Sequence, residues 1–169
     1  NITDYIKGCD PLYLADVNDQ MLFYVKTLWN EKYQKRINYY NYDETDKSPL
    51  HELPKNQFGL ILCVSYFNYK PLEMIVNFLN DFKQLLCNGG VAMFTYNNCS
   101  RPEGVDRVDK NFQTYVPKDL LIEIVKQTGF ELIKAVDASS TTSWIEIKKP
   151  GKIETLKGGQ TLAEILSLS

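Results

Sequence analysis

Residues 12–17, Leu-Tyr-Leu-Ala-Asp-Val, decide how this chain is interpreted. They form a short apolar run that ends in one acid, Asp16, and Asn18 or Asp19 can N-cap a helix directly after it. A buried strand that delivers a carboxylate at its C-terminal end, before a helix, is how open α/β sheets hold the ribose of a nucleotide. The two oxygens of such a carboxylate accept both vicinal hydroxyls. The alternative is an aspartate that only caps the turn.

Hydrophobic periodicity predicts strands and helices along the whole chain. The run 58–65, Phe-Gly-Leu-Ile-Leu-Cys-Val-Ser, is nearly continuously apolar, which is typical of a strand covered on both faces. The stretch 97–111 is predicted to be a polar loop. The other predicted elements are strands at 12–17, 36–40, 91–96, 130–137 and 142–148, and helices at 18–33, 71–87 and 115–128.

The order of these elements predicts an α/β protein. Alternation in the first part implies a parallel sheet with helices on either side. The last two strands are joined by a short link, which implies an antiparallel hairpin. We therefore expect a Rossmann-like three-layer sandwich, with a mostly parallel sheet and an antiparallel C-terminal edge hairpin. In the helix 18–33, one buried stripe is expected from Met21, Leu22, Val25, Leu28 and Trp29.

The composition is ordinary for a globular protein. Of the 169 residues, 44% are hydrophobic and 24% are charged. We expect one domain over residues 1–150, followed by a tail over 151–169 that carries a short helix at Thr161–Leu166. The net charge of −2 argues against a nucleic-acid partner. No apolar run approaches the ~20 residues of a membrane-spanning helix, so no membrane partner is expected.

The four cysteines, Cys9, Cys63, Cys87 and Cys99, are scattered along the chain. Their spacing argues against a zinc site and against a disulfide framework, and no other metal site is predicted. The usage of cysteine and the lack of a signal-peptide pattern favour a reducing, cytoplasmic setting.

The predicted ends of the strands form a polar and aromatic rim. Ligands of such sheets bind at these C-terminal ends. Ordinary loop polarity explains any one of these residues, but the joint pattern favours a nucleoside site. The rim comprises Asp16, Val17, Asn41, Tyr42, Asp43, Cys63, Val64, Ser65, Tyr66, Tyr96, Asn97 and Asn98.

The chain resembles the class I S-adenosylmethionine-dependent methyltransferases. The resemblance is carried by residues 12–22, 41–43, 58–69, 85–94 and 115–132, and the terminal hairpin fits the family's reversed edge strand. It implies methyl transfer from S-adenosylmethionine to an unidentified small-molecule or protein acceptor.

The resemblance also implies a role for each rim residue. Asp16, beside Val17, would hold the cofactor ribose. Asp43 would face the adenine amine, with Tyr42 flanking it. Cys63 and Ser65 would line the methionine and methyl end. The acceptor would be bound by Tyr66, Asn97, Asn98 and Arg101.

Two features of the sequence depart from the family pattern and leave alternative functions open. The family's glycine-rich loop and its strand would lie before Asn1, and Gly59 stands where an acid is frequent. A strand edge beside that position should be unpaired, so we expect ~30–60 further residues upstream, the size of one βα unit, or a homodimer formed through the gap. The alternative function is a catalytically inactive methyltransferase-like binding or structural module. A nicotinamide-cofactor enzyme fits the terminal hairpin less well.

Overall fold

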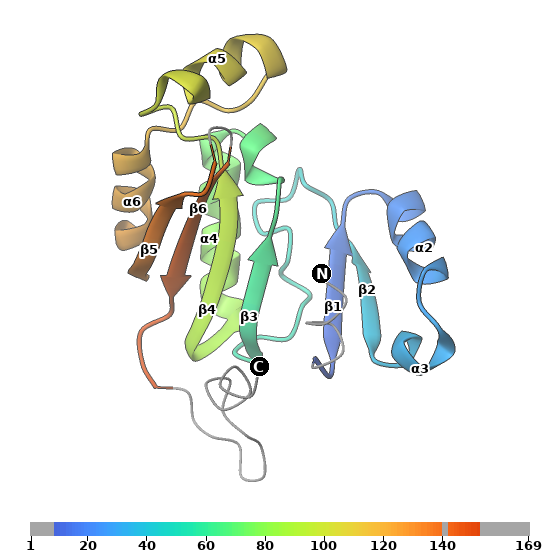
Figure 1. Cartoon of the computed structure of the whole chain (residues 1–169). Helices are drawn as coiled ribbons and strands as arrows, with labels where there is room; N and C mark the ends of the chain where they lie inside the picture. The colour runs from blue at the N-terminus through green and yellow to red at the C-terminus, as the bar shows by residue number, and fades with distance from the viewer. Residues whose placement is uncertain (1–8, 140–141, 153–169) are drawn as a thin grey trace. The chain divides into compact units, whose positions relative to one another are not determined.

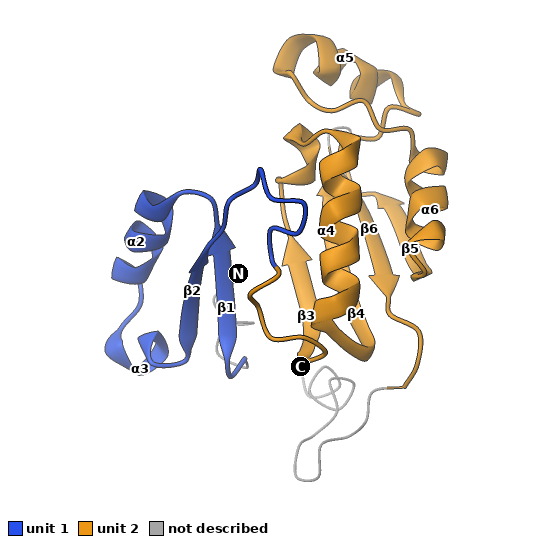
Figure 2. Cartoon of the chain, turned by 180° about the vertical axis from the view of Figure 1, so that it is seen from behind, with its two compact units in different colours: residues 1–50 blue, residues 51–169 orange. Residues whose placement is uncertain are grey.

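The computed structural model describes residues 9–139 and 142–152 (Figure 1). The chain divides into two compact units, unit 1 at residues 1–50 and unit 2 at residues 51–169 (Figure 2). Each unit is considered by itself below. The helix predicted at Thr161–Leu166 lies outside the described residues, and the single domain over 1–150 stays a prediction.

Unit 1 is a parallel pair of strands with two short helices. Strand β1 (Leu12–Asp16) pairs with β2 (Ile37–Asn41), and Asp16 lies opposite Asn41. The helices are α2 (Asp19–Thr27) and α3 (Glu31–Gln34). Both strands therefore end at the same edge of the small sheet, as the predicted rim requires.

The single helix predicted over 18–33 is wrong, because the structure divides it. The side chain of Asn30 accepts a hydrogen bond from the backbone N–H of Tyr33, at 3.3 Å, and this cap begins α3 as a separate helix. The predicted buried stripe is also wrong. Of its five residues only Leu22 is buried, whereas Met21 and Leu28 are 49% and 60% exposed. A nine-residue helix on two strands has little surface to pack against.

Unit 2 contains a four-stranded mixed sheet in the order β3-β4-β6-β5. Strands β3 and β4 are parallel, and β6 pairs antiparallel with both β4 and β5. The predicted α/β fold with an antiparallel C-terminal hairpin is thus confirmed, with the second strand of the hairpin inserted beside β4. The elements are β3 (Phe58–Cys63), η1 (Phe67–Tyr69), α4 (Leu72–Leu85), β4 (Leu86–Tyr96), α5 (Pro102–Asn111), α6 (Lys118–Gln127), β5 (Glu131–Asp137) and β6 (Ser143–Lys148).

Helices α4 and α6 lie on the same face of this sheet (Figures 1 and 2). The core lies between them and the strands, where Phe94, Ile145 and Ile147 are fully buried. The prediction that residues 58–65 are covered on both faces is wrong for the described structure. Leu62 and Val64 are 45% and 50% exposed, because alternate side chains of a strand point away from α4.

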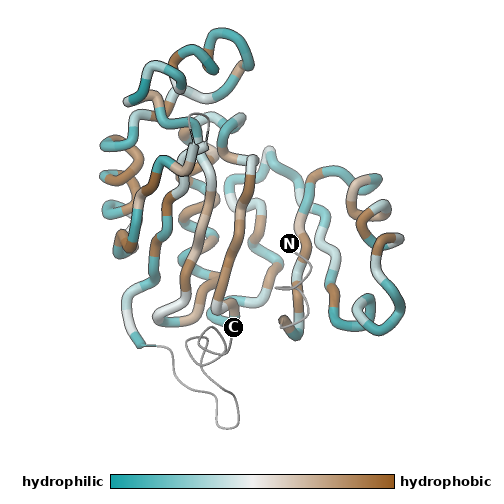
Figure 3. The backbone as a smooth tube through the Cα atoms, in the orientation of Figure 1, coloured by the Kyte–Doolittle hydropathy of each residue, from teal (hydrophilic) through white to brown (hydrophobic). Residues whose placement is uncertain are grey.

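Residues 97–111 do not form the predicted loop, since they include α5. Pro102 occupies the first turn of this helix, where its fixed φ is favourable. Asp106 and Lys110 form an ion pair across one turn, with a 2.6 Å N–O distance. The helix is largely hydrophilic (Figure 3), and Gly104 is its one buried residue. A Cβ at Gly104 would overlap the Asn98 carbonyl, so α5 approaches the backbone closely there.

Four strands keep one edge without a strand partner among the described residues: β1 and β2 in the two-stranded sheet, and β3 and β5 at the ends of the four-stranded sheet. Strand β1 pairs with β2 alone, and β3 pairs with β4 alone. Every open sheet has two such edges, so the unpaired edge that the sequence predicts beside a missing strand stays a prediction. In the described part of the chain, no helix has both the length and the apolar character needed to cross a membrane.

Candidate functional site

Asp16 lies at the C-terminal end of β1, as predicted. Its Oδ1 accepts a hydrogen bond from the backbone N–H of Asn18 at 2.8 Å, which closes the turn into α2. Its backbone carbonyl accepts from the Asn41 amide at 3.2 Å, so β2 helps to fix this end of β1. The second carboxylate oxygen, Oδ2, has no hydrogen-bond partner among the described residues. One oxygen therefore caps the turn and the other stays available to a ligand.

Asp43 follows β2 and is exposed. Its Oδ1 accepts two hydrogen bonds from Thr45, one from the backbone N–H at 2.8 Å and one from the hydroxyl at 2.7 Å. These bonds hold the pKa of Asp43 below its ordinary value. At neutral pH the group is thus an ionised and oriented hydrogen-bond acceptor.

The two residues predicted beside these carboxylates differ in accessibility. Val17 is 37% exposed, next to Asp16. Tyr42 is only 8% exposed, and its ring stacks on Tyr40 with 6.4 Å between the ring centroids. The Tyr42 ring mainly packs within unit 1 and offers little surface to a ligand.

The turn after β3 in unit 2 is strained and firmly held. Ser65 has a φ of 57°, in the left-handed region that residues other than glycine rarely adopt. Its backbone N–H donates to the Thr95 hydroxyl at 2.6 Å, and that hydroxyl donates to the Asn68 side-chain carbonyl at 2.9 Å. Strained backbone that is fixed by its surroundings is enriched at ligand sites. Ser65 is therefore the best-supported site candidate of this turn.

Cys63 and Tyr66 lie on either side of that turn. Burial raises the pKa of the Cys63 thiol to about 12, so the group is neutral at physiological pH and is not a nucleophile. The ring of Tyr66 packs edge-on against Phe78, with 5.4 Å between centroids, and Lys70 Nζ lies 4.6 Å from the Tyr66 centroid. Both residues shape the turn by packing.

Asn97 and Asn98 are buried, and their side chains are bonded within the chain. The Asn97 amide donates to the Gly104 carbonyl at 2.9 Å, which anchors α5. The Asn98 amide donates to Asp137 Oδ1 at 3.0 Å, and its carbonyl accepts from the N–H of Ser100, also at 3.0 Å. These two residues position the segment that leads to α5, whereas acceptor binding by them stays a prediction.

Asp137 is the centre of this network, although no sequence pattern singles it out. Besides Asn98, the Ser143 hydroxyl donates to its Oδ1 at 2.7 Å. Arg101 and Lys118 lie 4.0 and 3.9 Å from its two oxygens, and Arg101 also donates to the Ser139 carbonyl at 2.7 Å. Asp137 thus ties the terminal hairpin to the segments that flank α5.

The hydrogen bonds from Ser143 and Asn98, together with the nearby Lys118 and Arg101, hold the pKa of Asp137 below its ordinary value of 3.8. A lowered folded-state pKa stabilises the fold above the unfolded-state pKa, and this stabilisation is lost as the pH falls through the folded-state value. We expect Asp137→Asn to reduce the free energy of unfolding at pH 7 by about 1–2 kcal/mol, a figure discounted for partial exposure. Urea denaturation should show the difference at pH 7 and its loss as the pH falls below 3.8 and through the lowered folded-state pKa.

The matched control for Asp137→Asn is Asp106→Asn. Among the described residues, Asp106 pairs with Lys110 on the exposed surface of α5, so its replacement should leave the free energy of unfolding nearly unchanged. An Asp137→Asn variant as stable as the Asp106→Asn variant at pH 7 would show that the network contributes nothing.

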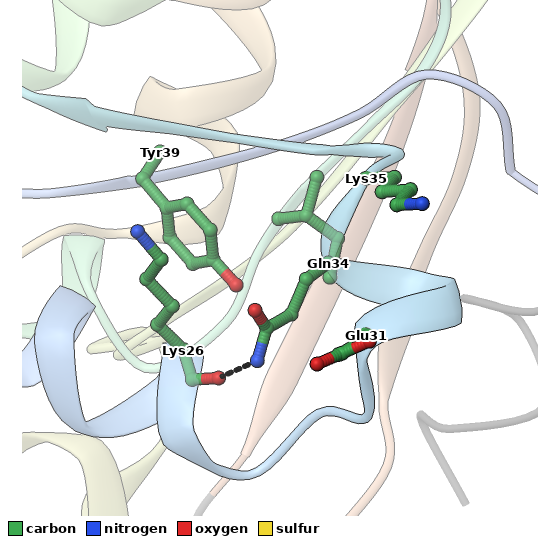
Figure 4. A pocket seen from close by; sticks show the side chains of 6 residues that line it. Lys26, Glu31, Gln34, Lys35 and Tyr39 are labelled. Atoms are coloured by element: carbon green, nitrogen blue, oxygen red, sulfur yellow. Dashed lines mark hydrogen bonds between the residues drawn. The ribbon is translucent and has the colours of Figure 1, made fainter.

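One pocket of unit 1 lies away from these residues. It has a volume of about 330 Å³ and is lined by Lys26, Glu31, Gln34, Lys35, Ile37 and Tyr39 (Figure 4). Gln34 closes one side by donating to the Lys26 carbonyl at 3.0 Å. Ile37 is the first residue of β2, so the pocket begins at the end of the strand opposite to Asn41. Because ligands of parallel sheets bind at the carboxyl ends, this pocket is not the candidate site.

In the described part of the chain, no group of three or more His, Cys, Asp or Glu side chains is placed to hold a metal ion. The site residues are hydrogen-bond acceptors and donors on turns, and the thiol among them is neutral. Such an arrangement can bind and orient a ligand.

No protein-family model and no curated protein sequence matches the chain. Solved structures resemble the chain in their fold, at low sequence identity. An S-adenosylmethionine-dependent methyltransferase from Mesorhizobium loti matches 81% of this chain and 80% of its own, with a TM-score of 0.64 at 11% identity. Magnesium protoporphyrin IX methyltransferase (ChlM) from Synechocystis PCC 6803, with bound SAH, matches 86% of this chain and 67% of its own, with a TM-score of 0.64 at 10% identity.

A [4+2]-cyclase, SpnF, matches equally well, over 85% of this chain and 67% of its own, with a TM-score of 0.65 at 12% identity. Two longer proteins are matched over only 53% and 42% of their length, so the chain spans about half of each. The chain has the fold of the class I S-adenosylmethionine-dependent methyltransferases. A cyclase among the matches shows that this fold also serves other chemistry.

Proposed function

We propose that the chain binds S-adenosylmethionine and takes part in methyl transfer to an acceptor. The observation that carries the proposal is the carboxylate of Asp16, which is fixed at the end of β1 by one oxygen and open at the other. A ribose offers two hydroxyl donors to such a group, and hydrogen bonds to a charged acceptor are the strong ones.

The residues of unit 1 fit the nucleoside part of this cofactor. Asp16 accepts from ribose hydroxyls, with the exposed Val17 beside it. Asp43 is ionised and oriented by Thr45, and it accepts from the exocyclic amine of adenine. Both carboxylates follow neighbouring parallel strands that end at one edge. Tyr42 supports the turn between them through packing.

The residues of unit 2 fit roles at the methionine and acceptor ends. The turn of Cys63 and Ser65 contributes a fixed backbone whose position depends on Thr95 and Asn68. Tyr66 and the guanidinium of Arg101 are the side chains proposed to touch the acceptor. Asn97 and Asn98 influence acceptor binding indirectly, because they position α5 and the segment that leads to it.

When bound, the cofactor supplies an electrophilic methyl group on a sulfonium. The contribution of the protein is to hold the reacting atoms in line and to exclude water, which can supply much of the rate without a metal or a covalent nucleophile. The neutral thiol of Cys63 is compatible with this role, because a thiolate there would compete as a methyl acceptor.

Calorimetric titration of the chain with S-adenosylmethionine, S-adenosylhomocysteine and NADH tests the proposal. We expect heat of binding from the first two ligands and none from NADH. Heat with NADH alone would assign the chain to nicotinamide chemistry, and no heat with any ligand would contradict cofactor binding altogether.

Turnover separates an enzyme from an inactive binding module. The measurement is release of S-adenosylhomocysteine in the presence of hydroxyl, amine and carboxylate acceptors. Binding of both sulfur ligands with no release above the rate in buffer, across all three acceptor classes, would favour the binding module.

A further inference from the structure

The pocket of about 330 Å³ in unit 1 has a lining that the proposed function does not use. Its walls come from residues 26–39 alone, at the end of α2, in α3 and at the beginning of β2 (Figure 4). Because one segment of unit 1 forms all of its walls, the pocket belongs to that unit by itself. We call it the α3 pocket. Its volume lies at the lower end of the range of small-molecule sites, ~300–1,000 Å³.

The segment around the α3 pocket is basic, although the whole chain carries a net charge of −2. Between residues 26 and 36 four side chains are cationic and one, Glu31, is acidic. Two of the cations, Lys26 and Lys35, line the pocket. Among the described residues, no carboxylate forms an ion pair with either of these lysines. Both ammonium groups are therefore available to an anion.

The wall and the floor of the α3 pocket are ordered by contacts within the unit. Lys26 Nζ lies 5.8 Å from the centroid of the Tyr39 ring, which is within the range of a cation–π interaction. The side-chain amide of Gln34 donates to the carbonyl of Lys26 at 3.0 Å and to that of Trp29 at 2.7 Å. These contacts set the positions of the groups that a ligand would meet.

The Tyr39 hydroxyl is a donor without an acceptor. It points between Lys26 and Gln34, with Lys35 on the other side of Gln34 (Figure 4). Its oxygen is buried and has no hydrogen-bond partner among the described residues. Burial raises the pKa of Tyr39 above its ordinary value of 10, so the hydroxyl keeps its proton at neutral pH. A buried donor that lacks a partner costs free energy, which an acceptor atom of a ligand would recover.

We propose that the α3 pocket binds a small organic phosphate that also carries hydroxyl groups. The ammonium groups of Lys26 and Lys35 pair with the phosphate, which lysine binds as a point charge. The Tyr39 hydroxyl donates to an oxygen of the ligand. The exposed carboxylate of Glu31 accepts from the hydroxyl groups of the ligand. Because Glu31 repels a bare anion, the site favours a ligand that carries donors beside its phosphate.

This inference does not rest on the proposed cofactor binding. The α3 pocket begins at Ile37, the first residue of β2, whereas the proposed ribose ligand Asp16 lies opposite Asn41, the last residue of that strand. The cofactor carries a sulfonium and no phosphate, so the two sites take ligands of different chemistry.

An NMR titration of the full chain with glycerol 3-phosphate tests the proposal. We expect saturable shifts of the backbone amides of residues 26–39, with a dissociation constant below ~1 mM. Inorganic phosphate should bind at least ~5-fold more weakly, and glycerol should cause no shift. Three results would overturn the proposal: no saturable shift in this segment, equal affinity for inorganic phosphate, or displacement of glycerol 3-phosphate by S-adenosylhomocysteine.

A matched pair of lysine variants separates the α3 pocket from the general charge of the segment. Lys26→Gln should weaken the binding of glycerol 3-phosphate about tenfold, because it removes a charged donor from the lining. Lys32→Gln removes the same charge from an exposed position of α3 that does not line the pocket, and it should change the affinity less than about twofold. Equal losses in both variants would mean that the ligand responds only to net charge, and the proposal would be wrong.

Tyr39→Phe removes the hydroxyl and keeps the ring beside Lys26. The affinity for glycerol 3-phosphate should fall about threefold, since one hydrogen bond to the ligand is lost. The free energy of unfolding should not fall, because the hydroxyl has no partner to lose among the described residues. Unchanged affinity in Tyr39→Phe would count against the assigned role of this hydroxyl and overturn the site as described.

Discussion

Replacing Asp16 with asparagine is expected to weaken the binding of S-adenosylhomocysteine about tenfold to hundredfold, since a hydrogen bond to a charged group contributes about 1.5–3 kcal/mol. Asparagine keeps a side-chain carbonyl that can accept from the N–H of Asn18, so the turn into α2 is preserved. The change therefore removes the charge and one acceptor oxygen. Calorimetric titration of both proteins gives the ratio of dissociation constants.

The control for Asp16→Asn is Asp19→Asn, which removes an acid three residues away in the exposed first turn of α2. Its dissociation constant should stay within about twofold of the original, because a surface charge interacts weakly with a ligand in salt. Urea denaturation should give the Asp16→Asn and Asp19→Asn variants equal free energies of unfolding, so that any difference in binding does not come from a loss of stability. Unchanged binding by Asp16→Asn would end the ribose assignment, even if the wild-type chain binds the ligand.

Replacing Phe67 with alanine is expected to cost about 3–5 kcal/mol of unfolding free energy, since truncating a buried aromatic ring leaves a cavity. Phe67 is fully buried, and its four aromatic neighbours are Tyr66, Phe78, Phe82 and Phe94. Its centroid lies 5.2 Å from that of Phe94 and 5.6 Å from that of Phe78. The loss leaves a cavity beneath the turn that holds Ser65, so ligand binding should weaken along with stability.

The control for Phe67→Ala is Phe112→Ala. Phe112 is 89% exposed at the end of α5, so its truncation should change the unfolding free energy by less than about 0.5 kcal/mol. Urea denaturation with equal m-values makes the two comparable. A cost below about 1 kcal/mol for Phe67→Ala would mean that the aromatic cluster relaxes to fill the gap.

Local patterns were sufficient for much of the fold. The positions of β1, β3, β5 and β6 follow from short apolar runs bounded by turn residues, and the strand with Asp16 at its end is where the sequence places it. Local patterns failed to predict the boundary between α2 and α3 and the presence of α5. Asn30 is an ordinary polar residue in a helical window, and only its bond to the N–H of Tyr33 reveals a helix start. Gly104 weakened the helical signal of α5, although a close backbone contact requires it.

The candidate site was predictable only in part, because its support is long-range. Asp16 and Asp43 were selected since they follow strands, and their turn partners are two residues away. Asp137 was not selected, because its partner Asn98 lies 39 residues away in the sequence. The burial of Tyr42 could not be predicted from its neighbours in the sequence. The resemblance places Tyr42 beside the adenine, but the fold of unit 1 uses most of its ring for packing.

The insertion of β6 between β4 and β5 has a consequence for synthesis on the ribosome. Strand β5 has no strand partner other than β6 among the described elements, although β6 is the last of them to be made. As the chain emerges, β3 and β4 can pair at once, whereas β5 must wait with its hydrogen-bonding groups unpaired until residue 148 has left the exit tunnel. Completion of the sheet is therefore a late, non-local step, and nascent chains stalled within β5 should be the ones that chaperones retain.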